Sequence, residues 1–319
     1  MKKTLRENSE LGTLNSELST HSTVLLDETV DGLELKAGAT AIDATVGTGG
    51  HSEKISHIVG KKGTLLVLDV DENSLKLSRE RLADALGKII YVQGNFRNIK
   101  TLAEDAGITS AEGIVFDLGW HSEQLAGGRG LSFKSDEPLL MTLGSDDNHL
   151  YTAKDIIKDW DEEEIARIIK EYGEEKFSGR IARVIVEERK KHTIETAKQL
   201  ADIISSAVPG FYRRGKIHPA TRTFQALRIA VNDELGALRE ALQEALALLA
   251  PGGRLAVISF HSLEDRITKQ AFREAEDADK GVRITKKPII PSEGERKKNP
   301  RARSAKLRIF EKNKTHNHE

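Results

Sequence analysis

The sequence contains no cysteine, which excludes disulfides, cysteine-ligated metal sites and a cysteine nucleophile. No apolar run approaches the roughly 20 residues that a membrane-spanning helix needs, and residues 1–20 lack the apolar core of a secretory signal. A general nucleic-acid binder carries an excess of positive charge. The net charge of −1 therefore argues against that class of protein. We therefore expect a protein of the reducing cytoplasm with no membrane partner and a flexible N-terminal tail over residues 1–20.

Short apolar runs alternate with longer helical patterns in the first part of the chain. The runs that indicate buried strands are Thr40–Ala44, Thr64–Val70, Ile89–Gln93 and Gly113–Leu118. Helical patterns at Ser52–Val59 and Glu72–Leu86 lie between them. This order is typical of βαβ units, so the sequence predicts an α/β fold with a mostly parallel sheet.

The alternation then stops, and the next buried-strand pattern, Arg254–Phe260, follows only after a gap too long for one crossover. Helices are predicted within the gap at Ala153–Tyr172, Phe177–Lys191 and Thr193–Ala207, and as one helix from Pro219 to about Ala250. A further helix at Ser262–Ala275 and a final edge strand at Ala305–Phe310 follow. We therefore predict a helical domain at 124–216, inserted into a sheet domain made of 21–123 and 217–311.

A glycine-rich loop joins the first predicted strand to the first helix. It reads DATVGTGGH over residues 43–51, so Gly47, Gly49 and Gly50 let the backbone turn sharply and approach a ligand. A dinucleotide motif would place a third glycine at Ser52. S-adenosylmethionine has no pyrophosphate to cradle, so the loop favours it, although another nucleotide and an ordinary glycine-rich turn stay open.

Polar and aromatic residues follow the next strands at the same predicted edge of the sheet. Asp69, about twenty residues past Gly49, is placed to accept hydrogen bonds from ribose hydroxyls, the alternative being a helix N-cap. Phe96 follows the third strand and is placed to pack on adenine, the alternative being core packing. Asp117 ends the fourth strand, where it would contact the adenine or the reacting amine, and Trp120 would stack on a flipped base. A turn-capping aspartate and a surface tryptophan are the plainer interpretations.

Positive charge is concentrated near the C-terminus despite the neutral total. Between Arg283 and Arg308 ten Lys and Arg residues are opposed only by Glu293 and Glu295. Such a strip can bind phosphates on a neutral protein, and Arg301 and Arg303 suit phosphate oxygens better than lysines would. A solvated charged segment is the alternative.

Several longer motifs make the chain similar to a known family. They are HSTVLLDE at 21–28, GTGGHS at 47–52, DLG at 117–119, RGLSF at 129–133, YGEE at 172–175, RIAR at 180–183, HPATRTFQALR at 218–228, ISFHSLEDR at 258–266 and NPRARSAKLR at 299–308. In this order they resemble the MraW family of 16S rRNA cytosine-N4 methyltransferases. The resemblance implies a class I S-adenosylmethionine-dependent methyltransferase fold with an inserted helical domain for substrate recognition. It also implies transfer of a methyl group to N4 of a cytidine in the decoding region of 16S rRNA, within the small ribosomal subunit.

The resemblance implies the cofactor contacts, and the places of the other candidates at the strand end, in the distinctive motifs and in the basic strip suggest their roles. Cofactor contacts fall on Gly49, Gly50, His51, Asp69, Phe96, Asp117 and Gln124. From its place at the end of the fourth strand, Asp117 is the candidate catalytic residue, as acceptor from the N4 amine, with a neighbouring backbone carbonyl as the alternative acceptor, and no metal is required. Candidate contacts to the substrate RNA are Trp120, His218, Arg222, His261, Arg266, Arg301 and Arg303. For His261, with Glu264 and Asp265 nearby, a structural histidine and a helix-surface ion pair stay open. The oligomeric state stays open as well, a homodimer included.

Two segments depart from the family's pattern, at 120–123 (WHSE) and at 138–143, where Leu140 and Thr142 replace an acid and an arginine. Three other functions are therefore weighed. A nicotinamide-dependent oxidoreductase is disfavoured by Ser52 and by the family motifs. A non-catalytic RNA-binding assembly factor and a methyltransferase with another acceptor stay open.

Overall fold

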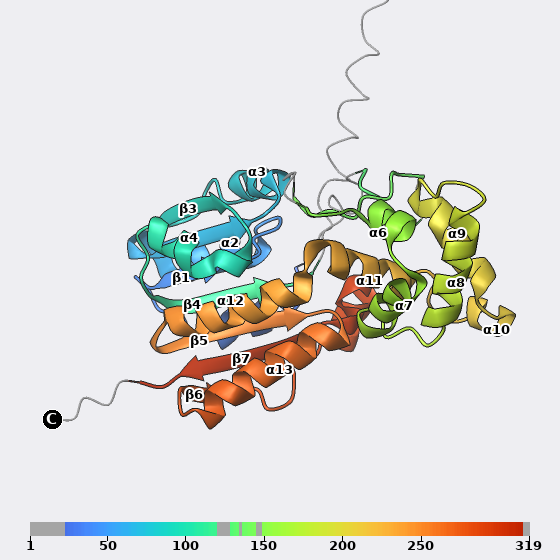
Figure 1. The fold of residues 1–319 in the computed structure, drawn as a ribbon. Helices are drawn as coiled ribbons and strands as arrows, with labels where there is room; N and C mark the ends of the chain where they lie inside the picture. Colours follow the sequence, from blue (N-terminus) through green and yellow to red (C-terminus); the bar gives the residue numbers. More distant parts are fainter. Residues whose placement is uncertain (1–22, 120–127, 134–135, 145–148, 315–319) are drawn as a thin grey trace, which may run out of the picture.

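A computed structural model describes residues 23–119, 128–133, 136–144 and 149–314 (Figure 1). The described chain forms a seven-stranded sheet with the strand order β3-β2-β1-β4-β5-β7-β6. Its strands are β1 (Thr40–Asp43), β2 (Thr64–Asp69), β3 (Lys88–Gln93), β4 (Ala111–Asp117), β5 (Leu249–Ser259), β6 (Gly281–Arg283) and β7 (Lys306–Lys312). The first five strands are parallel, whereas β7 runs antiparallel to β5 and β6 antiparallel to β7.

Both faces of the sheet are covered, which is why its central strands are apolar at successive positions. On one face Ile42 and Leu66 pack with α4 (Ile99–Asp105), α12 (Glu234–Leu248) and α13 (Ser262–Asp277). On the other face Ala41 and Leu65 pack with α1 (Leu26–Gly32), α2 (Gly50–Val59) and α3 (Glu72–Arg81). The result is a three-layer α/β/α sandwich, the α/β fold that the sequence predicts.

A second core lies beyond the carboxyl ends of β4 and β5, whose arrows point toward it in Figure 1. Its helices are α6 (Ala153–Asp159), α7 (Glu162–Glu171), α8 (Ser178–Arg189), α9 (Ala197–Ala207), α10 (Gly210–Arg213) and α11 (Thr221–Asn232). The remaining elements are η1 (Gly60–Lys62), η2 (Phe96–Asn98), α14 (Glu293–Lys298) and η3 (Pro300–Ser304). No helix in the described ranges has the length and apolar character needed to cross a membrane.

Two helices that the sequence predicts as continuous are each broken in two. The first stops at Asp159 and resumes at Glu162, with an extended Trp160 between α6 and α7. The second is interrupted at Asp233, which adopts a left-handed conformation (φ 46°) between α11 and α12. Aspartate tolerates this conformation better than most residues, and Arg97 forms an ion pair with the Asp233 carboxylate. The break lets the apolar face of α11 enter the helical core while α12 covers the sheet.

The domain limits predicted from sequence stay a proposal, and the packing of α11 bears on where the second limit belongs. Leu227 and Val231 of α11 belong to the helical core, whereas Leu238 and Leu242 of α12 belong to the core of the sheet. We therefore propose that the helical unit extends to Asn232, past the predicted limit at residue 216.

The prediction that the last strand lies at the edge is wrong. The short strand β6 pairs with the outer side of β7 through residues 281–283, so β7 lies inside the sheet. Arg308 of β7 is 5% exposed, and it donates from Nε to Asp265 Oδ1 of α13 at 2.7 Å. Burial opposes ionisation of Asp265, but the hydrogen bonds and charges of Arg308 and Lys306 outweigh it and lower the pKa of this carboxyl.

Replacing Asp265 should therefore destabilise the protein by leaving Arg308 charged and without this carboxylate inside the sheet. We expect Asp265→Asn to lower the free energy of unfolding by about 3 kcal/mol. The double variant Asp265→Asn/Arg308→Met should recover part of the loss, because it also removes the buried charge. Urea unfolding of the two single variants and the double variant measures the coupling. If the double variant loses as much free energy of unfolding as the two single variants together, the two side chains do not interact.

Candidate active site at the carboxyl edge of the sheet

Two adjoining cavities open where the parallel strands end. The larger, with a volume of about 500 Å³, lies between the ends of β1, β2 and β4 and the junction of α11 with α12. Its volume falls in the range of ligand pockets, roughly 300–1,000 Å³. The smaller, of about 60 Å³, shares Thr45, Gly47, Asp117 and Gly119 with it. These shared residues make the two cavities parts of one site.

The loop after β1 forms the floor between the cavities. Asp43 is buried, and it accepts from Ser52 Oγ at 2.6 Å and from the Thr45 amide at 3.2 Å, which ties the start of α2 to the strand. Gly49 has φ 84°, where a side chain would be strained. Gly50 abuts Thr23, and a β-carbon there would overlap the Thr23 hydroxyl oxygen. Gly50 lines the smaller cavity, whereas the position of a Gly49 side chain would face Ser78 and Arg81.

Asp69 stands at the end of β2 against the larger cavity. Its Oδ2 accepts from the Gly47 amide at 3.0 Å and its Oδ1 from the Asp71 amide at 2.9 Å. It therefore fixes the glycine-rich loop beside the second strand. The N-cap of α3 is Asp71, which accepts from the Asn73 amide at 3.2 Å, so the N-cap interpretation of Asp69 does not hold.

Phe96 lines the larger cavity together with Gly94, Asn95 and Leu118. Its ring meets the ring of Phe116 edge-on, with centroids 5.7 Å apart and an interplanar angle of 78°. Phe96 therefore packs on the core and faces the cavity at once, so that the two interpretations drawn from the sequence are compatible.

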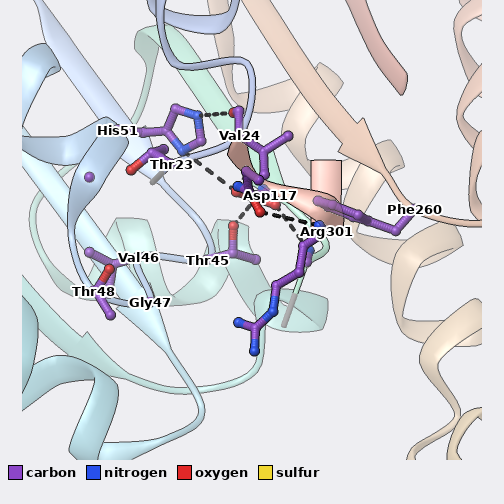
Figure 2. Close-up of a pocket in the computed structure, with 13 residues that line it drawn as sticks. Thr23, Val24, Thr45, Val46, Gly47, Thr48, His51, Asp117, Phe260 and Arg301 are labelled. Carbon is purple, nitrogen blue, oxygen red and sulfur yellow. Dashed lines mark hydrogen bonds and ion pairs between the residues drawn. The ribbon is translucent and has the colours of Figure 1, made fainter. Parts of the chain in front are cut away.

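Asp117 and His51 face each other between the cavities (Figure 2). The Asp117 amide donates to Thr45 Oγ1 at 2.6 Å, and Asp117 Oδ1 accepts from the Gly119 amide at 3.0 Å. His51 Nε2 lies 3.2 Å from the Val24 carbonyl, which can only accept, so this nitrogen carries the proton. His51 Nδ1 is then an unprotonated acceptor, 3.7 Å from Asp117 Oδ2. His51 Nδ1 thus offers an acceptor beside Asp117, and the ionised Asp117 carboxylate offers a second one.

Burial shifts the protonation of these groups. It raises the pKa of Asp43 and Asp69 to about 6 and that of Asp117 to about 7, and it lowers the pKa of His51 to about 4. The negative charges of Asp43 and Glu264 add to the rise at Asp117. Among the described residues no Lys or Arg forms an ion pair with Asp43, Asp69 or Asp117. The site therefore holds two buried carboxyls and one partly buried carboxyl that lack a countercharge.

The smaller cavity joins segments from opposite ends of the chain. Thr23 and Val24 lie on one side of it, and Phe260, Asn299 and Arg301 on the other (Figure 2). The Arg301 amide donates to Asn299 Oδ1 at 3.2 Å, which fixes the start of η3. Arg301 is thus the one predicted RNA contact in the described residues that lines either cavity.

The other predicted RNA contacts lie elsewhere. His218 stacks on Phe133 with ring centroids 4.4 Å apart, and Arg222 donates to the Glu174 carbonyl at 3.1 Å. Arg266 pairs with Glu174 at 3.0 Å, and Arg303 is exposed on η3. Trp120 and Gln124 lie outside the described residues.

His261 begins α13 as its N-cap, in a capping box with Glu264. His261, Glu264 and Glu234 bring ligand-type atoms within 4.8 Å of one another. His261 Nδ1 accepts from the Glu264 amide at 3.4 Å, so its proton is on Nε2, the nitrogen that a cation would need free. Glu234 already accepts two hydrogen bonds from Arg228, at 2.7 and 2.8 Å. The cluster therefore fits a hydrogen-bonded helix start better than a metal site.

The sequence analysis missed three residues of the site. Thr45 binds the backbone of Asp117, and its place inside the glycine-rich loop was the signal for it. Glu264 lines the larger cavity and accepts from the Phe260 amide at 2.7 Å. Asn299 reaches the smaller cavity from a segment remote in sequence, and no local pattern indicates that contact.

The chain has a mostly parallel sheet, a glycine-rich loop after the first strand, and acids at the ends of β2 and β4. This is the architecture of a class I methyltransferase. The family model of the MraW methylase family matches residues 18–313, so this chain belongs to the MraW methylase family.

Relatives with curated names support the same family. A protein of Brevibacillus brevis named "Ribosomal RNA small subunit methyltransferase H" is 47% identical over 92% of this chain and 98% of its own length. One of Symbiobacterium thermophilum with the same name is 45% identical over 92% of this chain and 96% of its own. A solved structure described as an rRNA methylase from Streptococcus thermophilus covers 93% of this chain and 100% of that one, with 12% identity and a TM-score of 0.44. At that level the likeness in structure adds nothing to the assignment.

Proposed function

We propose that this protein uses S-adenosylmethionine to methylate N4 of a cytidine in the decoding region of 16S rRNA, acting on the small ribosomal subunit in the cytoplasm. Membership of the MraW methylase family and the names of the two relatives support the reaction class and the substrate. The larger cavity has a position and a volume that suit the nucleoside part of the cofactor.

The observation that carries the choice of cofactor is the group of buried carboxyls without a countercharge. Asp43, Asp69 and Asp117 have raised pKa values chiefly because burial disfavours their ionised forms. A cationic ligand would stabilise these ionised forms, whereas the pyrophosphate of a dinucleotide would repel them. S-adenosylmethionine carries a sulfonium and an ammonium against one carboxylate, a net positive charge, so the carboxyls favour it over a nicotinamide dinucleotide with its pyrophosphate.

The residues of the two cavities suggest how the cofactor would be held. Asp69 keeps free lone pairs that can accept from ribose hydroxyls, since each of its oxygens has one amide partner. Phe96 and Leu118 offer an apolar surface for adenine. Gly50 and His51 would lie along the methionine end, beside the smaller cavity. Gly49 would act by setting the turn, and the contact predicted for Gln124 falls outside the described residues.

His51 and Asp117 are suited to hold the reacting amine. Cytosine N4 is a weak nucleophile because its lone pair is delocalised into the ring, and S-adenosylmethionine supplies a methyl group activated by a sulfonium. His51 Nδ1 and ionised Asp117 Oδ2 can accept hydrogen bonds from the N4 amine, which would hold N4 beside the larger cavity, where the methyl group of the cofactor would lie. The pKa of Asp117, near 7, suits it to take the proton that N4 loses. Arg301, at the mouth of the smaller cavity, would bind a phosphate of the same strand.

The affinity for S-adenosylmethionine should rise with pH. A bound cation favours the ionised carboxyls, so their pKa values fall on binding and protons are released. Below about pH 6 to 7 the free site holds these protons and binding must expel them. Calorimetry should show affinity rising by up to about tenfold per pH unit for each carboxyl up to pH 7 and levelling above it.

S-adenosylhomocysteine is the matched control, because it keeps the ammonium and lacks the sulfonium. Its affinity should rise less steeply over the same pH range. Equal slopes for the two ligands, or an affinity that does not change with pH, would contradict the role given to the buried carboxyls.

The reaction itself is tested with unmodified small ribosomal subunits and methyl-labelled S-adenosylmethionine, followed by nucleoside mass spectrometry. We expect labelled N4-methylcytidine. Asp117→Asn should lower kcat by about a hundredfold or more, because the amide cannot take a proton, while cofactor affinity changes by less than about tenfold. Asp84→Asn, at an exposed position after α3, is the matched control and should leave kcat unchanged.

The other results each favour another function. Cofactor binding without methyl transfer would favour a non-catalytic assembly factor, and a labelled product other than N4-methylcytidine would show a changed acceptor. A normal rate in Asp117→Asn would remove the proton-accepting role of Asp117 and leave the reaction class intact.

A further inference from the structure

An aromatic and basic surface lies at α10, at the end of the helical unit far from the sheet (Figure 1). The ring of Phe177 contacts Phe211 and Tyr212, with centroids 6.4 and 5.0 Å away. The Lys176 ammonium lies 5.1, 5.8 and 5.2 Å from the centroids of Phe177, Phe211 and Tyr212. Phe211 is 64% exposed, so one large ring of this cluster is open to a ligand.

The segment that follows Phe211 in the chain carries positive charge. Arg213, Arg214 and Lys216 follow it directly, are exposed, and form no ion pair within the described ranges of the chain. The segment 210–217 (GFYRRGKI) contains no acidic residue. The nearby Glu175 is 1% exposed, and its carboxylate accepts from the Tyr212 hydroxyl.

We propose that this surface, formed by Lys176, Phe211, Arg213, Arg214 and Lys216, binds a single-stranded stretch of the substrate RNA away from the methylated cytidine. An exposed ring stacks on any unpaired base, and cations around it pair with the flanking phosphates. Protein–protein interfaces are depleted in lysine, whereas Lys176 and Lys216 belong to this surface and no acidic residue in the segment 210–217 offsets its charge. The proposal rests on the proposed function, since it names a second contact for the same RNA.

Contacts within the protein connect this surface to the candidate site. His218 follows the basic segment and stacks on Phe133, and Arg222 holds the backbone of Glu174. The Glu174 side chain accepts from Ser262 and pairs with Arg266 at the start of α13, next to Phe260 of the smaller cavity. The helical unit is thus fixed to the wall of the cavity, and an RNA strand bound at α10 would be held at a set place relative to it.

Variants of Phe211 test the stacking. Phe211→Leu removes the ring and keeps an apolar side chain, Phe211→Tyr keeps the ring, and Val282→Ala on the edge strand β6 is the control at another exposed apolar residue. Affinity is measured by fluorescence anisotropy with a short labelled single-stranded oligoribonucleotide and a duplex of the same sequence. We expect Phe211→Leu to weaken single-strand binding by about tenfold and Phe211→Tyr to bind as the wild type does.

The cations are tested by salt dependence. Arg213→Ala/Arg214→Ala should lower the slope of log affinity against log salt by about 1.4, at about 0.7 for each cation lost on a single strand. Lys61→Ala/Lys62→Ala, exposed in η1 at the opposite edge of the sheet, should leave the slope unchanged. Methyl transfer to small subunits should show a raised KM and an unchanged kcat for the Phe211 and Arg213/Arg214 variants.

Cofactor binding and methyl transfer by the wild type separate the two proposals. A wild type that transfers no methyl group overturns the proposed function, and the anisotropy result then stands alone. An active wild type whose Phe211→Leu and Arg213→Ala/Arg214→Ala variants keep their RNA affinity, salt slope and KM overturns the surface. A changed oligomeric state in those variants with unchanged RNA affinity also overturns it, because the surface would then bind protein.

Discussion

Asp43 and Asp69 are buried and Asp117 is partly buried, and no Lys or Arg of the described chain neutralises them; the site depends on this constraint. Asp43, Asp69 and Asp117 stand at the ends of adjacent parallel strands, and their pKa values are raised to between about 6 and 7. Hydrogen bonds from Ser52, Gly47 and Gly119 compensate only part of the cost of burying them. A ligand that brings positive charge completes the site, which connects the fold directly to the choice of cofactor.

The same carboxyls organise the backbone around them. Asp43 and Asp69 hold the two sides of the glycine-rich loop, and Gly50 lets Thr23 approach it. That approach brings Val24 to His51, whose tautomer is set by the Val24 carbonyl. An unprotonated nitrogen therefore faces Asp117 because of a segment far from it in sequence.

The sheet could largely be predicted from sequence, because buried parallel strands are apolar on both faces and stand out as short runs. The break at Asp233 could not, since the apolar spacing continues through it, and the role of Gly236, which leaves room for the Asp233 carboxylate, shows only in the structure. The prediction that β7 lies at the edge of the sheet was wrong, because a three-residue strand such as β6 gives too little sequence pattern to detect. For the same reason alternation along β7 could not tell an edge strand from one covered by a short neighbour.

Some residues of the candidate site could likewise be predicted from the sequence, and others could not. Asp69 and Asp117 could be predicted from their places at strand ends, and both line the larger cavity. The pairing of His51 with Val24 and the approach of Asn299 depend on contacts between remote segments, so spacing could not reveal them. His261 illustrates the limit of a motif, because its position in ISFHSLEDR admitted both a ligand contact and a structural role, and its side chain caps α13.

The protonation of His51 tests the central claim most directly. Nitrogen-15 NMR of the imidazole, assigned by comparison with His51→Gln, distinguishes the two neutral tautomers from the charged form. We predict a proton on Nε2 and none on Nδ1 at pH 7, with protonation of the ring only near pH 4. A proton on Nδ1 at pH 7, in either the other tautomer or the charged ring, would contradict the account, because the acceptor pair with Asp117 would not exist.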